Sequence, residues 1–134
     1  MDALRALVVD DEEDFLETIV KRMQRRKVDV QGVESGEAAL RALEARPWDV
    51  VVLDIKMPGM DGIETLREIK KRSPTVEVIL LTGHGSIESG MQGMRLGAFD
   101  YVIKPPDLDE LLEKMAQARE RKTLHEKRIE EGLS

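Results

Sequence analysis

The fold is decided by residues 50–62, which read VVVLDIKMPGMDG. Val50–Asp54 is an apolar run that ends in an acid, as is typical of a strand buried on both faces of a parallel sheet. The proline and glycines that follow indicate a loop, and Asp61 is placed to cap a helix over Gly62–Arg72. A buried strand followed by a helix is the repeating unit of an α/β fold.

The same unit recurs along the rest of the chain, where short β-rich runs alternate with longer amphipathic stretches. The other strands are expected at Leu4–Val9, Val28–Val33, Val76–Thr82 and Tyr101–Ile103. The other helices are expected at Glu13–Arg26, between Ser35 and Pro47, at Ser86–Leu96 and from Asp107 onward. Val28–Val33 alternates apolar and polar residues, which favours an edge strand. These repeated units predict a parallel sheet with helices on both faces.

Composition and charge restrict the class of protein. At 134 residues the chain is long enough for one domain with a substantial core and too short for two. Its apolar runs are far too short to cross a membrane, and we expect no secretory signal at the N-terminus. A net charge of −6 argues against direct binding of DNA or RNA. The absence of cysteine excludes disulfides and thiolate chemistry and fits a cytoplasmic protein.

The residues that directly follow the predicted strands are the candidates for chemistry, because ligands of parallel α/β sheets bind at the carboxyl ends of the strands. They are Asp10, Asp11, Asp54, Thr82 and Lys104. Three carboxylates in one crevice repel one another, and a divalent cation with oxygen ligands relieves that cost. The expected ion is therefore Mg²⁺ or Mn²⁺ rather than zinc.

Simpler explanations exist for each residue taken alone. Asp10 and Asp11 could cap a helix, Asp54 could be a turn residue, and a lysine at the end of a strand is often only solvated. Acids at two strand ends together with Lys104 make these explanations weaker. Phosphoryl transfer needs positioning and charge neutralisation, so a carboxylate nucleophile supported by a metal and a lysine suits this set. No second acid or histidine is placed to drive rapid hydrolysis, which favours a persistent aspartyl phosphate and a switch.

Four segments of the chain resemble the response-regulator receiver family of bacterial two-component systems. They are VVDDE at 8–12, VVLDIKMPGMDG at 51–62, LLTG at 80–83 and GAFDYVIKP at 97–105. Within the family, the chain looks most like receivers found on activators of the alternative sigma factor. The resemblance implies a flavodoxin-like doubly wound (βα)5 fold with a parallel sheet in the strand order 2-1-3-4-5.

The resemblance also implies how the site works. Asp54 would be the phosphoacceptor, phosphorylated by a sensor histidine kinase. Mg²⁺ would be bound by Asp11, Asp54 and the backbone carbonyl of Lys56, with Asp10 assisting, often through water.

Lys104 and Thr82 would contact the phosphoryl group, according to the same resemblance. Tyr101 would be the switch aromatic, turning inward when Thr82 is drawn toward the phosphate. The Lys104–Pro105 peptide bond would be cis.

The fourth predicted helix departs from the pattern in carrying Gly90 and Gly93 in its interior. Interior glycines weaken a helix by about 0.5–1 kcal/mol each relative to alanine. We therefore hypothesise that this helix is marginal and is the mobile part of the switch. The alternative is that the glycines only permit close packing.

We expect a receiver domain over residues 1–118 and a charged, exposed helical extension or linker over 119–134, where the apolar stripe thins. The main reading is a response regulator that is not an enzyme and acts through its fourth helix, fifth strand and fifth helix. The alternative is an isolated receiver domain of a larger transcriptional activator. A downstream protein target or output domain and a phosphorylation-dependent homodimer are the expected partners, with no direct nucleic acid or membrane binding.

Three other interpretations fit less well. A phosphatase of the haloacid dehalogenase type needs a second acid two residues after its nucleophile, where this chain has Lys56. A flavin-binding electron carrier needs a glycine- or hydroxyl-rich loop after the first strand, where residues 10–12 are all acids. A receiver that serves only as a scaffold is disfavoured because every expected site residue is present.

Overall fold

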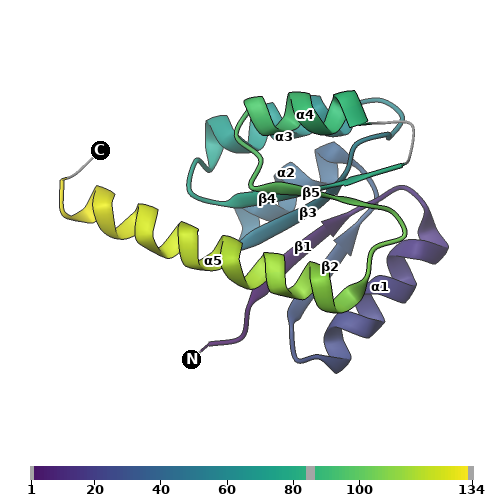
Figure 1. The fold of residues 1–134 in the computed structure, drawn as a ribbon, viewed down its shortest axis with the longest axis horizontal. Helices are drawn as coiled ribbons and strands as arrows, with labels where there is room; N and C mark the ends of the chain where they lie inside the picture. Colours follow the sequence, from purple (N-terminus) through teal and green to yellow (C-terminus); the bar gives the residue numbers. More distant parts are fainter. Residues whose placement is uncertain (1, 84–86, 133–134) are drawn as a thin grey trace.

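The computed structural model describes residues 2–83 and 87–132. Its centre is a parallel sheet in the order β2-β1-β3-β4-β5, as expected for a flavodoxin-like doubly wound fold (Figure 1). The strands are β1 (Arg5–Val9), β2 (Asp29–Val33), β3 (Val50–Asp54), β4 (Glu77–Thr82) and β5 (Asp100–Ile103). The predicted fold class and strand order are therefore confirmed.

Helices cover both faces of this sheet (Figure 1). Those on one face are α1 (Glu13–Arg25) and α5 (Leu108–Glu130), and those on the other are α2 (Gly36–Ala45), α3 (Gly62–Arg72) and α4 (Ile87–Arg95). The expected start of α4, Ser86, lies outside the described residues. Within the described part of the chain, none of the helices has the length and apolar character needed to span a bilayer.

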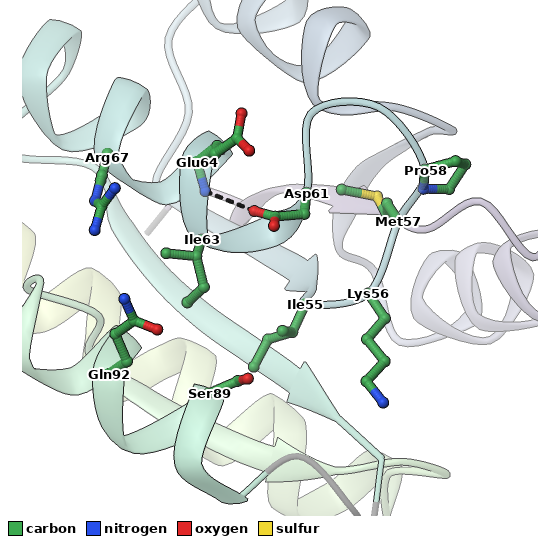
Figure 2. Close-up of a pocket in the computed structure, with 10 residues that line it drawn as sticks. All are labelled: Ile55, Lys56, Met57, Pro58, Asp61, Ile63, Glu64, Arg67, Ser89 and Gln92. Carbon is green, nitrogen blue, oxygen red and sulfur yellow. Dashed lines mark hydrogen bonds between the residues drawn. The ribbon is translucent and has the colours of Figure 1, made fainter.

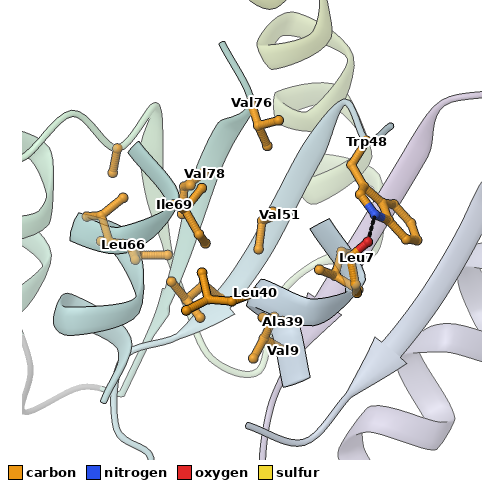
Figure 3. Close-up of a cluster of buried hydrophobic side chains, with 14 of the residues drawn as sticks. Leu7, Val9, Ala39, Leu40, Trp48, Val51, Leu66, Ile69, Val76 and Val78 are labelled. Carbon is orange, nitrogen blue, oxygen red and sulfur yellow. Dashed lines mark hydrogen bonds between the residues drawn. The ribbon is translucent and has the colours of Figure 1, made fainter. Parts of the chain in front are cut away.

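The central strand β3 shows why the sheet forms. Val50 and Val52 point into the core beneath α1 and α5, whereas Val51 and Leu53 point into the core beneath α2 and α3. All four side chains are fully buried, and β3 pairs with β1 on one side and β4 on the other. The second of these cores, with Trp48 at its rim, is drawn in Figure 3. A continuous apolar run is thus the pattern that a strand covered on both faces requires.

Strand β2 is the edge of the sheet, as its alternating pattern predicted. Its residues are exposed or half-buried, in contrast to the fully buried β3. Asp61 caps α3 as expected, because its carboxylate accepts a hydrogen bond from the Glu64 backbone N–H at 2.9 Å. The Lys104–Pro105 peptide bond is cis.

The two glycines of α4 lie against the sheet and are buried. A Cβ atom on Gly93 would stand 2.1 Å from Cδ1 of the buried Leu80, so only glycine fits without a shift of that side chain. A Cβ atom on Gly90 would lie 3.4 Å from Tyr101 Cγ, an acceptable contact. Close packing therefore explains Gly93, and the marginal stability of α4 remains a prediction.

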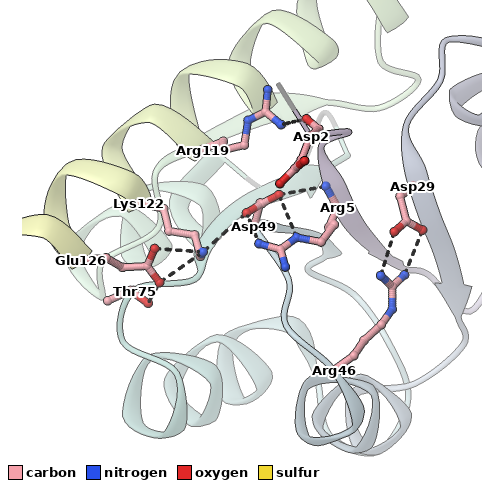
Figure 4. Close-up of polar contacts among 9 residues, drawn as sticks. All are labelled: Asp2, Arg5, Asp29, Arg46, Asp49, Thr75, Arg119, Lys122 and Glu126. Carbon is pink, nitrogen blue, oxygen red and sulfur yellow. Dashed lines mark hydrogen bonds and ion pairs between the residues drawn. The ribbon is translucent and has the colours of Figure 1, made fainter.

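The N-terminal end of the sheet carries a set of ion pairs around two buried carboxylates, Asp49 and Glu77, and Figure 4 shows part of it. We call it the basal ion network and define it as Arg5, Asp49, Glu77, Arg121 and Lys122. Arg5 donates to Asp49 through its backbone N–H at 2.9 Å and through its guanidinium at 2.9 and 3.3 Å. Lys122 lies 3.4 Å from Asp49, and Arg121 donates two hydrogen bonds to Glu77.

The burial of Lys122 corrects one expectation from the sequence. An exposed extension was predicted from Arg119 onward, yet Lys122 is only 7 % exposed. It continues the face of α5 that packs on the sheet, and the buried carboxylate of Asp49 accepts its charge there. The helix therefore stays attached to the sheet past the end of its apolar stripe, and only its last turns project beyond the sheet (Figure 1).

Candidate functional site: an acidic cluster with a lysine

Three carboxylates meet at the C-terminal ends of β1 and β3. Asp54 is the last residue of β3, and Asp10 directly follows β1, the parallel neighbour in which Val9 pairs with Leu53. Glu12 follows in the turn that leads into α1. One carboxylate oxygen from each of Asp10, Glu12 and Asp54 lies within 4.8 Å of the others, and we call these residues the acidic cluster.

Burial makes this cluster electrostatically unfavourable. Asp10 is fully buried and Asp54 is 7 % exposed, whereas Glu12 lies at the exposed rim. Loss of hydration and then the negative charge of Asp10 raise the pKa of Asp54 to about 6, against the opposing effects of Lys104 and a hydrogen bond from the Lys56 backbone. Burial also raises the pKa of Asp10. Carboxylates that are buried close to one another are stabilised by any further positive charge that binds beside them.

Lys104 supplies one positive charge from the end of β5. Its ammonium nitrogen lies 2.7 Å from Asp10 Oδ2 and 2.6 Å from Glu12 Oε1. It also stands 4.4 Å from the centre of the Phe15 ring on α1. One ammonium cannot balance three carboxylates, so the cluster keeps an excess of negative charge.

Thr82 is the last residue of β4, next to β3, whereas Tyr101 is the second residue of β5. Thr82 is 1 % exposed, and its Oγ1 has no hydrogen-bond partner among the described residues. Tyr101 is half-buried and packs against the core beneath α2 and α3. The buried hydroxyl of Thr82 is thus available to a ligand oxygen.

Glu12 joins the acidic cluster, and the expected role of Asp11 as a metal ligand stays a prediction. Asp11 is exposed and does not belong to the acidic cluster, whereas Glu12, which was not among the expected site residues, does. The only signal for Glu12 in the sequence was its position in the acidic run 10–12. The conformation of the turn that leads into the helix decides which acids of such a run reach the cluster. The residue types alone do not reveal that conformation.

The donor set fits a hard divalent cation. It consists of carboxylate oxygens alone, it lies at the carboxyl ends of parallel strands, and it is short of positive charge. Mg²⁺ prefers such ligands, whereas zinc sites in proteins usually contain histidine or cysteine. The acidic cluster is therefore suited to Mg²⁺.

A separate cavity of about 680 Å³ opens next to the site, between α3 and α4 (Figure 2). Lys56 forms part of its wall, together with Ile63 and Arg67 of α3 and Ser89 and Gln92 of α4. None of the three acidic-cluster residues lines it. The cavity is therefore distinct from the acidic cluster.

Comparison with known proteins agrees with this geometry. The family model for the response regulator receiver domain matches residues 6–116. The chain is 43 % identical over 112 residues to the regulatory protein AtoC of Escherichia coli, covering 80 % of this chain and 23 % of AtoC. It is 37 % identical over 105 residues to the DNA-binding transcriptional regulator NtrC of Klebsiella pneumoniae, covering 78 % and 22 %. The chain thus spans about a quarter of the length of these relatives.

Solved structures show the same likeness. A response regulator receiver domain protein from Clostridium thermocellum superposes with a TM-score of 0.86 at 36 % identity, covering 90 % of this chain and 98 % of that one. The receiver domain of NtrX from Brucella abortus gives 0.81 at 34 % identity, covering 86 % and 98 %. The chain belongs to the response regulator receiver domain family, as its four motifs predicted.

Proposed function

We propose that Asp54 accepts a phosphoryl group from a phosphohistidine of a sensor histidine kinase and that this modification switches the protein's interaction surface. The observation that carries the proposal is the buried Asp54 carboxylate in a cluster with too little positive charge. A site of this kind gains stability when a cation and a phosphoryl group arrive together. Such an arrangement suits a signalling module better than a structural ion pair.

The reaction needs Asp54 as a carboxylate, which it is for the most part at pH 7 because its pKa is about 6. One of its oxygens attacks phosphorus, and the new P–O bond forms as the P–N bond of the phosphohistidine breaks. The imidazole nitrogen keeps the electron pair of the broken bond. A bound Mg²⁺ would offset the negative charges of the carboxylates and of the phosphoryl oxygens.

Other residues hold the ion and the phosphoryl group in this proposal. Asp10, Asp11, Asp54 and the carbonyl of Lys56 are the proposed metal ligands, and two of them, Asp10 and Asp54, belong to the acidic cluster. Thr82 donates its hydroxyl, which has no partner among the described residues, to a phosphoryl oxygen. The Lys104 ammonium contacts a second oxygen, as a point charge at the end of β5.

The switch links Thr82 to the surface through Tyr101. Movement of Thr82 toward the phosphoryl group opens space into which the Tyr101 ring turns. Gly90 supports this role, because a Cβ there would lie 3.4–3.5 Å from both residues. Thr82, Tyr101 and α4 are therefore packed closely enough for a movement of one to affect the others.

The output surface in this proposal is the face of α4, β5 and α5. It carries large apolar side chains that are 39–52 % exposed, namely Ile87, Met91, Met94 and Ile103. Exposed apolar side chains that lie together suit a protein partner. That partner is a downstream target or an output domain, and a phosphorylation-dependent homodimer is the second candidate.

The chain acts as a phosphoacceptor and not as an enzyme with turnover, apart from slow loss of its own phosphoryl group. The lack of cysteine agrees with the cytoplasmic location that the proposal includes. A receiver domain of a larger transcriptional activator is the alternative. It is favoured by the fact that the chain matches about a quarter of each full-length relative.

The proposal is tested by incubating the protein with Mg²⁺ and phosphoramidate and measuring its intact mass. A gain of about 80 Da, one phosphoryl group, is expected for the wild type and is absent from Asp54→Asn. Asp61→Asn is a matched control, because it lies in the same loop and asparagine also caps helices. An equal mass gain in Asp54→Asn, or none in the wild type, would overturn the proposal.

A further inference from the structure

The Lys104 ammonium makes its hydrogen bonds beside Asp54 and not to it. It has three N–H groups, and two of them donate to Asp10 and to Glu12, at 2.7 and 2.6 Å. Among the described residues, no hydrogen bond joins it to Asp54. The Phe15 ring, 4.4 Å away, packs against the same ammonium from α1. The hydrogen bonds and the ring contact of Lys104 thus all come from the β1–α1 turn and α1, whereas Asp54 acts on it only through its charge.

Glu12 differs from Asp10 in how easily it can release this lysine. The Glu12 side chain is 65 % exposed, whereas that of Asp10 is completely buried and also accepts the Glu12 backbone N–H at 2.8 Å. Glu12 occupies the N-cap position of α1, yet its side chain makes no capping hydrogen bond. Its carboxylate is directed to Lys104 instead. It can turn into solvent at little cost, because water replaces the contact.

We infer that Glu12 is a positioning residue that holds the Lys104 ammonium back from Asp54 until a phosphoryl group is present. The inference rests on the proposed function and adds a step to it. As the phosphoryl group reaches Asp54, Lys104 exchanges the Glu12 carboxylate for a phosphoryl oxygen while its contact with Asp10 can remain. Glu12 therefore restrains phosphorylation and takes Lys104 back when the phosphoryl group is lost.

The exchange has a consequence that can be measured. Removing the negative charge of Glu12 leaves Lys104 with one charged partner in place of two, so the ammonium reaches a phosphoryl oxygen more readily. An ion pair with one exposed partner is weak, so we expect phosphorylation by phosphoramidate to become about threefold faster in Glu12→Gln. Glutamine keeps the length of the side chain and leaves the backbone cap of α1 intact.

Glu13→Gln is the matched control. It removes the same charge from the next residue, which is exposed in the first turn of α1 and is not among the partners of Lys104. Its phosphorylation rate should equal that of the wild type. An increase of the same size in both variants would show a general effect of charge and would overturn the inference.

Two further measurements separate the inference from other roles of Glu12. The NMR signal of the Lys104 ammonium should shift or broaden in Glu12→Gln without phosphate, and it should stay unchanged in Glu13→Gln. Mg²⁺ affinity, measured by calorimetry, should change less than twofold. A tenfold loss of Mg²⁺ affinity would make Glu12 a metal ligand instead, and an unchanged Lys104 signal would remove its role as a restraint.

The inference and the proposed function fail in different ways. A wild type that gains no phosphoryl mass refutes the proposed function. A wild type that is phosphorylated no more slowly than Glu12→Gln refutes the role of Glu12 alone.

Discussion

The two ends of the central sheet carry buried charges that are balanced in opposite ways. At the N-terminal end, the buried Asp49 lies between Arg5 and Lys122, so one carboxylate has two cationic partners. At the C-terminal end, Asp10, Glu12 and Asp54 share a single lysine. The same strand, β3, runs from one cluster to the other.

The pKa values of the two aspartates show what the difference means. Burial would raise the pKa of Asp49, but the hydrogen bonds and the charge of Arg5 outweigh burial and lower it. Burial and the charge of Asp10 raise the pKa of Asp54 to about 6. The first cluster is complete within the chain and stabilises the fold. The second costs stability and keeps an excess of negative charge, which is the expected mark of a functional site.

The largest effect on stability should come from Asp49→Asn. Removing the charge of Asp49 takes the buried partner from Arg5 and leaves the buried Lys122 ammonium with only the exposed Glu126 carboxylate, so we expect the free energy of unfolding to fall by about 3–4 kcal/mol. Urea denaturation monitored by circular dichroism measures it. Asp29→Asn is the control, because it breaks an exposed pair with Arg46 and should cost less than about 1 kcal/mol. Equal losses in both variants would remove the distinction between the two ends.

The free energy of unfolding should depend on pH through both ends of the sheet, that is, through Asp54 and Asp49. Asp54 binds protons more tightly when folded, so the free energy of unfolding should fall as the pH rises from about 4 to 7, by on the order of 3 kcal/mol without Mg²⁺. Asp49 has a lowered pKa, so its contribution should be lost as the pH falls below about 4. The stability maximum is therefore expected near pH 4–5. Urea midpoints that rise steadily up to pH 7 would contradict this.

Alanine substitutions of the two glycines in α4 compare a position near the site with a position in the core. Gly93→Ala should lower the free energy of unfolding by about 1 kcal/mol, because overpacking against Leu80 outweighs the gain in helix propensity. Gly90→Ala, beside Thr82 and Tyr101, should raise it by about 0.5 kcal/mol, because its contacts are ordinary. Thermal and urea unfolding of both variants test the signs. Stabilisation by both substitutions would mean that helix propensity, rather than packing, limits α4.

The smallest effect should be seen at Trp48. It precedes β3 at the N-terminal end of the sheet and is 2 % exposed, with its indole N–H donating to the Ala42 carbonyl at 2.8 Å. It lies six positions before Asp54 along extended chain, a separation of about 20 Å. Its fluorescence should therefore change by no more than a few per cent when Mg²⁺ is added. Strong quenching on addition of Mg²⁺ would show that the two ends of the sheet are coupled and would contradict this prediction.

Much of the fold followed from the sequence because the determining patterns are local. Apolar runs identified β3 and β4 to within a residue, and the acids and lysine after the strands identified the edge of the sheet that carries the site. The contact of Glu12 with Lys104 depends on the conformation of the β1–α1 turn, which no sequence pattern reveals, so Glu12 was missed. Lys122 was taken as exposed, because no pattern within α5 reveals that Asp49 lies opposite.

Gly93 is a second example of a contact between distant elements that the sequence does not reveal. A glycine inside a helix reads as a weak point until the position of Leu80 is known. Contacts between elements that are distant in the chain decide such cases. Sequence patterns located the functional edge of the sheet, while the balance of charge at each end required the structure.

The central claim is that the buried negative charge of Asp54 lowers the stability of the fold and serves to bind a ligand. Asp54→Asn tests it most directly through urea denaturation at pH 7 with and without Mg²⁺. We predict that the variant is more stable than the wild type by about 2 kcal/mol without Mg²⁺, and that Mg²⁺ stabilises only the wild type. A variant less stable than the wild type, or equally stabilised by Mg²⁺, would contradict the account.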